Sequence, residues 1–367
     1  MRLTVLSVAF PFAPLTTDPA GGAEQVLVNI DRALVRGGHE SLVMAAEGSE
    51  VRGRLIPLDR PPQHLNETAR RNGQEAVRRA LAQTCANEAV DVVHLHGSDF
   101  YAYLPTERVP TLVTLHMPLT WYPTAALKRQ RSQIWFNPVS SAQARTAWAG
   151  LDLLPPIENG VDVNTLQALA GRAKRKFALA FGRICPEKGF HHAMDASARA
   201  KIPLLLAGAV YPWPEHLQYF QQQITPRLGR ACRWIGRIYG ERKRRLLTAA
   251  RCLLIPSLVD ETSSLVAMES LAAGTPVIAF PVGALPRIVE HGVTGYIVRD
   301  IAEMAEAIGL VDRLEPEICR RVARERFDLG RSTDAYLDLY RRIAAHEIER
   351  KLPPESIQHT VAHRCPC

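Results

Sequence analysis

The stretch that decides the fold is residues 260–281, which read DETSSLVAMESLAAGTPVIAFP. An apolar run at 251–256 precedes it, and a second one at 277–280 follows Gly274 and a proline. Short apolar runs bounded by turn residues are typical of buried strands, and glycine followed by proline ends a helix. The stretch therefore predicts a strand, a short helix and a second strand.

The start of this helix carries the hydroxyl side chains of Thr262, Ser263 and Ser264. We expect these hydroxyls to cap the helix and to leave its backbone N–H groups free to face a ligand. The helix dipole favours anions at this end, so phosphates are expected at Ser263, Ser264 and Leu265.

Two glutamates bracket the turn: Glu261 precedes the helix, and Glu269 lies on its second turn. A carboxylate accepts two hydrogen bonds from a vicinal diol, so Glu269 suits a ribose. The alternative is an amphipathic helix with two solvated glutamates. The strand before the pair and the Gly-Thr-Pro stop after it favour a binding site.

The rest of the 367-residue chain alternates strands and helices in two halves. This pattern predicts an α/β protein with two facing Rossmann-like, doubly wound domains and a cleft between them. The expected strands are 3–8, 41–45, 90–95, 111–115 and 135–140, then 177–181, 203–207, 232–235, 251–256 and 277–280. Expected helices include 24–36 and 66–87. The predicted divisions are an N-terminal domain at 1–156, a C-terminal domain at 157–330, a helix at 331–352 that crosses back, and a loose tail at 353–367.

Three further motifs follow strands. Gly21 and Gly22 open a helix, where a backbone without side chains can approach a ligand closely. Residues 181–189 read FGRICPEKG and place Arg183 and Lys188 after a strand. Taken alone, an Arg and a Lys after a strand are surface charges more often than not. His116 ends another strand.

Together these motifs resemble the retaining family-4 glycosyltransferases of the GT-B fold. The resemblance implies that Glu261 holds sugar hydroxyls, that His116 contacts the donor sugar, and that Arg237 and Ile238 hold the nucleotide base. It also implies transfer of a hexose, glucose or a related sugar, from a UDP-linked donor to an acceptor hydroxyl. No metal or other cofactor is expected, because the resemblance implies that Arg183, Lys188 and helix amides stabilise the negative charge of the leaving diphosphate. The leaving phosphate would act as the base, so no dedicated carboxylate nucleophile is required.

The same resemblance places the hinge between the domains near Asn159 and Gly160. One departure from it concerns Glu261 to Ser264, which read Glu-Thr-Ser-Ser where many relatives have Glu-Gly-Phe-Gly. The two missing glycines remove backbone freedom, and the hydroxyls add donors for phosphate, so the departure bears on the choice of donor.

For several histidines and cysteines the sequence leaves open whether they are structural or bind a metal. His94 and His96 are expected to support the fold or the acceptor side, and zinc binding by these two with His116 is the alternative. The seven cysteines lack disulfide spacing and are expected to be reduced. Near the end, His363, Cys365 and Cys367 could bind metal, but a frayed terminus is the expectation.

The net charge of +8 includes basic clusters at 70–71 with 78–79, 172–176, 242–245 and 320–326. Such runs are usually solvated helix faces; the sharper interpretation is peripheral contact with an anionic membrane. Nothing indicates a nucleic-acid partner. Without an export signal or a spanning segment, a cytoplasmic protein is expected, and the sharper interpretation places it at the inner face of the membrane.

Two other functions compete with the transferase. A sugar-nucleotide-binding partner protein without turnover would keep the same donor site. A nicotinamide dehydrogenase does not fit, because no Gly-x-Gly-x-x-Gly follows the first strand.

Overall fold

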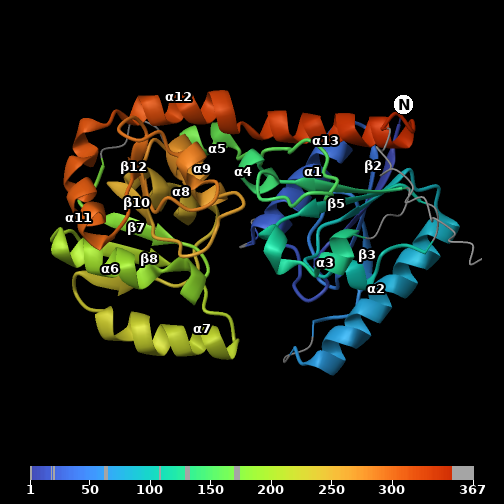
Figure 1. The fold of residues 1–367 in the computed structure, drawn as a ribbon, viewed down its shortest axis with the longest axis horizontal. Helices are drawn as coiled ribbons and strands as arrows, with labels where there is room; N and C mark the ends of the chain where they lie inside the picture. The colour runs from blue at the N-terminus through green and yellow to red at the C-terminus, as the bar shows by residue number, and fades with distance from the viewer. Residues whose placement is uncertain are drawn as a thin grey trace, which may run out of the picture.

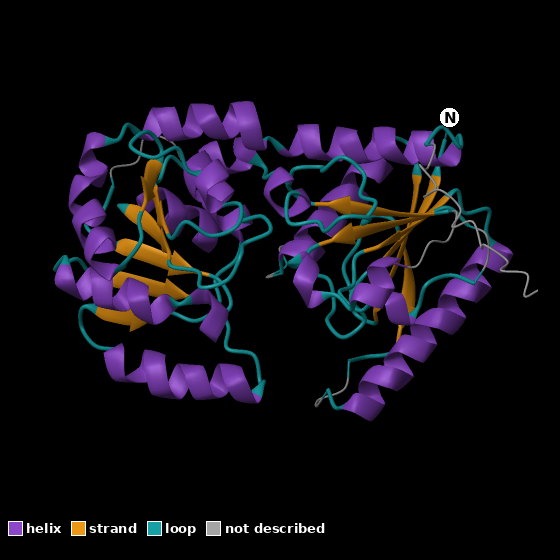
Figure 2. Ribbon diagram, viewed as in Figure 1, coloured by secondary structure: helices purple, strands orange, loops and turns teal. Residues whose placement is uncertain are grey.

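The computed structural model describes residues 2–348 apart from 18, 20, 62–64, 107, 108, 129–132 and 169–173. The expected tail at 353–367 lies outside the described residues, as do Cys365 and Cys367. Each half of the chain forms a six-stranded parallel sheet with helices on both faces (Figures 1 and 2). The predicted two-domain, doubly wound α/β fold is therefore confirmed.

The first sheet has the order β3-β2-β1-β4-β5-β6, and the second has the order β12-β11-β10-β7-β8-β9. The strands of the first are β1 (Thr4–Val8), β2 (Glu40–Ala46), β3 (Arg54–Leu58), β4 (Val92–Leu95), β5 (Thr111–Leu115) and β6 (Ile134–Pro138). Those of the second are β7 (Ala178–Phe181), β8 (Leu204–Ala207), β9 (Cys232–Trp234), β10 (Cys252–Ile255), β11 (Val277–Ala279) and β12 (Gly295–Ile297).

The helices cover these sheets on both sides. In the first domain they are α1 (Gly22–Arg36), α2 (Glu67–Asn87), α3 (Thr124–Lys128) and α4 (Ser141–Ala144), whereas α5 (Val163–Gln167), which comes next in the chain, packs in the core of the second domain. In the second half they are α6 (Phe190–Arg199), α7 (Pro214–Tyr219), α8 (Gly240–Ala249), α9 (Leu265–Ala272), α10 (Leu285–Ile288), α11 (Ile301–Leu310), α12 (Pro316–Phe327) and α13 (Leu329–Ala344).

Buried strands explain why the apolar runs were readable from sequence. Successive side chains of a strand point to opposite faces, so both faces of a covered sheet must be apolar. In β10, Leu253 packs into the core on the side of α8, α9 and α12, and Leu254 into the core on the side of α6 and α11. Strands β3 and β12 were not predicted. Both are edge strands; β3 contains Pro57, and β12 has only three residues.

The chain passes between the domains twice, and the two crossings are hydrogen-bonded to each other. Val161 N–H donates to Phe327 O at 2.8 Å, and Leu329 N–H donates to Val161 O at 3.0 Å. A Cβ on Gly160 would lie 2.8 Å from Asp328 O, so the crossings touch where the hinge is predicted.

After the second crossing, α13 runs along the first domain while α12 stays on the second (Figure 1). Its Tyr336, Tyr340 and Ile343 are buried in one core with Leu3 and Val5 of the first sheet. The helix was expected from residue 331 and begins at Leu329. Its burial is the physical reason that α13 returns to the first domain.

Candidate active site

The topology places the predicted residues at the same edge of each sheet. Strand order reverses between β1 and β4 in the first domain and between β7 and β10 in the second. Ligands of open α/β sheets bind beyond the carboxyl ends of the strands at such a reversal. The segments that leave β1, β7 and β10 carry Gly21, Arg183 and Glu261, and His96 follows β4 directly.

The carboxylate of Glu261 is held by two groups of its own domain. Its Oε1 accepts from Lys188 Nζ at 2.6 Å and from Ser257 Oγ at 2.5 Å. Gly189 makes this approach possible, because it adopts a left-handed φ of 59° and a Cβ there would lie 2.2 Å from Pro256 O. The loop after β7 therefore packs on the exit of β10, which brings two predicted catalytic residues together.

Glu269 lies in α9, is 5% exposed and receives bonds from both domains. Its Oε1 accepts from Lys243 Nζ at 3.1 Å and from Gln25 Nε2, on α1, at 3.0 Å. Neither partner was predicted. The basic run at 242–245 was expected to be solvated, which is wrong for Lys243: it is 8% exposed, four residues before the buried Leu247 on the same face of α8.

The hydroxyl groups before α9 do not cap it as expected. Ser264 occupies the N-cap position, but its side chain makes no capping hydrogen bond. Thr262 Oγ1 instead donates to His116 O at 2.8 Å in the first domain, and Thr262 O accepts from Ser140 Oγ at 2.5 Å. The Oγ of Ser263 is buried without a hydrogen-bond partner among the described residues. Thr262 therefore serves the contact between the domains, and the start of α9 keeps backbone donors that no side chain caps.

The glycine pair of α1 lies against this helix start. Gly21 is the N-cap of α1, again without a side-chain cap, and a Cβ on Gly22 would lie 3.6 Å from Leu265 Cδ1. Two helix N-termini from different domains are thus neighbours, and both favour anions.

Glu24, the last residue of the Gly-Gly-Ala-Glu run, was not singled out from sequence. Its carboxylate folds back so closely that a Cβ on Gly21 would lie 1.9 Å from Glu24 Oε2. Burial raises the pKa of Glu24, while its own backbone N–H and the charge of Arg183 act in the opposite direction. Arg183 of the second domain therefore lies within electrostatic reach of the first. The sequence signal that could have identified Glu24 is its place directly after the glycines, because an acidic residue in the first turn of a helix lies at the same helix end.

Three histidines meet at the carboxyl ends of β4 and β5. His96 Nδ1 and His116 Nε2 are hydrogen-bonded at 3.1 Å, and their rings stack at 5.4 Å. Burial lowers the pKa of His116 to about 3 and that of His96 well below its ordinary value. These rings are therefore neutral at physiological pH. His94 is fully buried and bonded to Tyr340 at 2.6 Å and Thr114 at 2.7 Å, which fits the expected support of the fold.

The remaining predicted residues lie after β9. Ile238 is buried in the core beneath α8, and Arg237 is exposed on the surface. No contact of these side chains with Glu261 or Glu269 is recorded among the described residues, so their predicted role in holding the base stays a prediction.

Two facing Rossmann-like domains, with a helix start from each meeting between them, are the arrangement of the GT-B fold. The family model described as Glycosyltransferase Family 4 matches residues 20–149, and that described as Glycosyl transferases group 1 matches residues 175–311. The chain belongs to the family-4 glycosyltransferases, and the predicted family and enzyme class are confirmed.

Known relatives agree with this assignment, and they match different shares of the chain. A phosphatidyl-myo-inositol mannosyltransferase of Mycobacterium leprae is 24% identical over 347 residues, 86% of this chain and 88% of that protein. A D-inositol 3-phosphate glycosyltransferase of Saccharomonospora viridis is 43% identical over 105 residues, which span 26% of this chain and about a quarter (24%) of that protein. The Anabaena HepE structure in complex with UDP-glucose is similar with a TM-score of 0.70 at 21% identity, covering 92% of this chain and 99% of that one.

Proposed function

We propose that this glycosyltransferase moves a hexose from a UDP-linked donor to an acceptor hydroxyl with retention at the anomeric carbon. The donor diphosphate would lie between Arg183, Lys188 and the start of α9, and the ribose would lie against Glu269. Glu261 and His116 would bind the sugar, and Arg237 and Ile238 the base. The HepE complex with UDP-glucose supports the choice of donor by analogy of fold.

The observation that carries the proposal is the Lys188–Glu261 pair at the uncapped start of α9. The Lys188 ammonium, 2.6 Å from Glu261 Oε1, can bind a donor phosphate instead, and the Glu261 carboxylate can then accept hydrogen bonds from sugar hydroxyls. The unpartnered Ser263 hydroxyl and the free N–H groups of α9 supply further donors for the same anion.

In the proposed step, the acceptor oxygen bonds to the anomeric carbon while the bond from that carbon to the phosphate oxygen breaks. The electron pair of the broken bond stays on the diphosphate, and the acceptor proton passes to a phosphate oxygen. Lys188 and Arg183 stabilise the growing negative charge, and the neutral ring of His116 can exchange hydrogen bonds with the sugar. No metal is needed for this balance.

A donor screen tests the proposal directly. Purified protein is given UDP- and GDP-linked hexoses with a panel of hydroxyl acceptors, and release of the nucleoside diphosphate is followed with and without EDTA. We expect UDP release that persists in EDTA. Strict dependence on a divalent cation would contradict the metal-free step. Tight UDP-sugar binding without turnover on any acceptor would instead favour the sugar-nucleotide-binding partner protein.

We also propose that the acceptor is bound at a membrane, and the exposed basic residues of α2 support this. Its Arg70, Arg71 and Arg79 are exposed on the first domain, whereas on α12 Arg320 and Arg324 share Glu317. None of the helices described has the length and apolar character to cross a bilayer. Vesicles with anionic lipid should therefore bind the protein in low salt and release it as salt screens the charges. Equal binding of neutral vesicles would contradict this.

A further inference from the structure

One group of three metal-ligating side chains stands out within the part of the chain that the structure describes. Cys185 and Glu187 lie in the loop after β7, and His216 lies in the first turn of α7. One ligand atom of each is within 4.8 Å of the other two. We propose that these residues bind a single divalent cation of the kind that prefers sulfur and nitrogen ligands, with zinc as the first choice.

Two polar atoms of this group lack partners, whereas the Cys185 thiol donates to Arg183 O at 3.6 Å. Glu187 Oε2 and His216 Nδ1 are buried without hydrogen bonds to any described residue. Cys185 is 1% exposed and His216 is 5% exposed, so solvent reaches neither freely. Buried polar side-chain atoms are nearly always paired, and two orphans in one small cluster point to a ligand between them.

The ligand set selects the cation. Thiolate, imidazole and carboxylate are the usual ligands of zinc, whereas magnesium and calcium prefer oxygen alone. When the cation binds, the Cys185 thiol loses its proton to solvent and a metal–sulfur bond forms. The thiolate and the Glu187 carboxylate then balance the two positive charges, and a tetrahedral ion keeps its fourth position for water.

Before the cation binds, the thiol is held protonated. Burial raises the pKa of Cys185 to about 11. Burial acts to raise the pKa of Glu187 as well, but its own backbone N–H and the Cys185 thiol outweigh that and lower it. The thiol thus already lies against the carboxylate that would share the cation with it.

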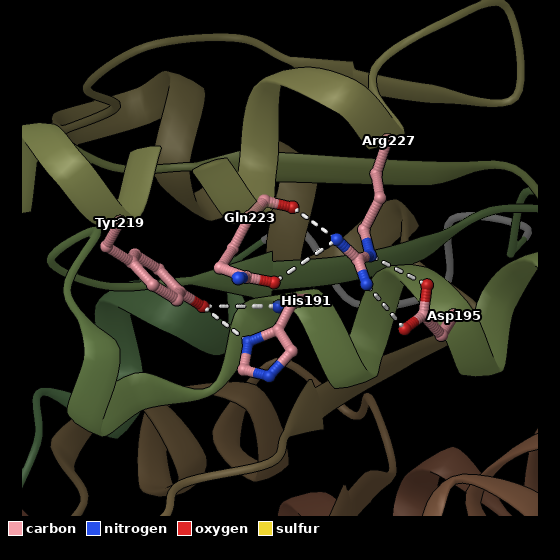
Figure 3. A network of polar contacts seen from close by, with 5 residues as sticks. All are labelled: His191, Asp195, Tyr219, Gln223 and Arg227. Atoms are coloured by element: carbon pink, nitrogen blue, oxygen red, sulfur yellow. Dashed lines mark hydrogen bonds and ion pairs between the residues drawn. The ribbon is translucent and has the colours of Figure 1, made fainter. Parts of the chain in front are cut away.

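Both sides of the cluster are anchored. Figure 3 shows the contacts that tie α6, which follows the loop directly, to the segment that continues α7. The Tyr219 hydroxyl meets His191 Nδ1 at 3.0 Å, and Arg227 Nε donates to Asp195 Oδ1 at 2.8 Å. The ring of His216 is further enclosed by Trp213, at 4.8 Å between centroids. Fixed ligands of this kind lower the cost of organising a metal site.

None of the three proposed metal ligands is assigned to the donor sugar or its phosphates, although Cys185 and Glu187 stand between Arg183 and Lys188 in sequence and the charge of Arg183 acts on all three ligands. A donor screen without turnover would therefore contradict the proposed reaction and leave the metal-site proposal standing. Full activity in EDTA is likewise compatible with the metal site, because the proposed reaction does not use the cation.

The test is metal binding to the full chain after stripping with chelator. Zinc is titrated in competition with a chromophoric chelator, and cobalt is used as a spectroscopic stand-in. Because His363, Cys365 and Cys367 are also possible ligands, the titration is repeated on C365S/C367S. We expect one equivalent bound in that variant, and a cobalt spectrum with a thiolate charge-transfer band and tetrahedral intensity.

Single substitutions assign the ligands. Cys185→Ser, His216→Gln and Glu187→Gln should each weaken zinc binding at least tenfold, and only Cys185→Ser should abolish the charge-transfer band. Cys232→Ser and His291→Gln are the matched controls and should leave binding unchanged. Glu187→Gln conserves the shape of the side chain, and circular dichroism checks that each variant is folded. The proposal is overturned if C365S/C367S binds no zinc, or if its zinc binding is insensitive to all three substitutions.

Discussion

On the second domain, Glu261 and Glu269 are paired with Lys188 and Lys243, so the site there consists of fixed charges. On the facing edge of the first domain, His116 is kept neutral by burial and the backbone is exposed at glycines. Charged groups suit a diphosphate whose charge grows during reaction, whereas neutral groups can bind hydroxyls without holding an ion. The difference supports the proposal that the second domain holds most of the donor.

Lys188→Ala should give the largest effect. It removes the cation that is expected to stabilise the leaving diphosphate, and loss of one such group costs about a hundredfold or more in turnover. Steady-state kinetics with UDP-sugar checks this, with Arg245→Ala on the exposed face of α8 as the control for net charge. Turnover within a few-fold of wild type would remove the main distinction between the two domains.

Glu269→Gln should come next, acting on UDP affinity. Gln replaces one of the two oxygens that accept from the ribose diol with a donor and removes the counter-charge of Lys243, and a buried group left unpaired costs about 1–3 kcal/mol, roughly five- to 150-fold in Kd. Calorimetry measures the affinity, and thermal unfolding separates it from the stability lost when Lys243 stays buried without its ion pair. Unchanged UDP affinity in a folded variant would show that the ribose lies elsewhere.

The neutral histidines predict a pH dependence of stability. The pKa of His116 is about 3 in the folded chain, below that of an exposed histidine, so the unfolded chain binds the proton first. Stability should therefore fall as pH drops from about 6.5 toward 3, by up to ~1.4 kcal/mol per pH unit for this one group. Chemical denaturation across that range should give a shallower slope for His116→Gln. Identical slopes would mean that His116 is not held neutral.

Gln25→Ala should give the smallest effect. It removes the hydrogen bond from α1 to Glu269, which is one of three side-chain hydrogen bonds that join the domains at this site. One such bond contributes about 0.5–1.5 kcal/mol. Small-angle scattering of the free protein should show a slightly more open shape that closes when UDP is added. A variant as compact as wild type without UDP would mean that Gln25 does not help to hold the domains together.

The sequence by itself determined the doubly wound fold and the places of the motifs. Strands buried on both faces must be apolar throughout, and glycine and proline mark their ends, so β1, β5, β7 and β10 were found within a few residues. Edge strands such as β3 carry less of this signal, because one side faces solvent and a proline is tolerated.

Only the tertiary structure decided which side chains meet. Gln25 and Glu269 are 244 residues apart, and Lys188 and Glu261 are 73 apart, so no local pattern connects them. Likewise, Thr262 was expected to help cap α9, but Ser264 occupies the N-cap position and the Thr262 hydroxyl donates to His116 O in the first domain. The same holds for Cys185, Glu187 and His216, whose spacing in sequence resembles no metal motif and whose meeting depends on how α7 packs beside α6.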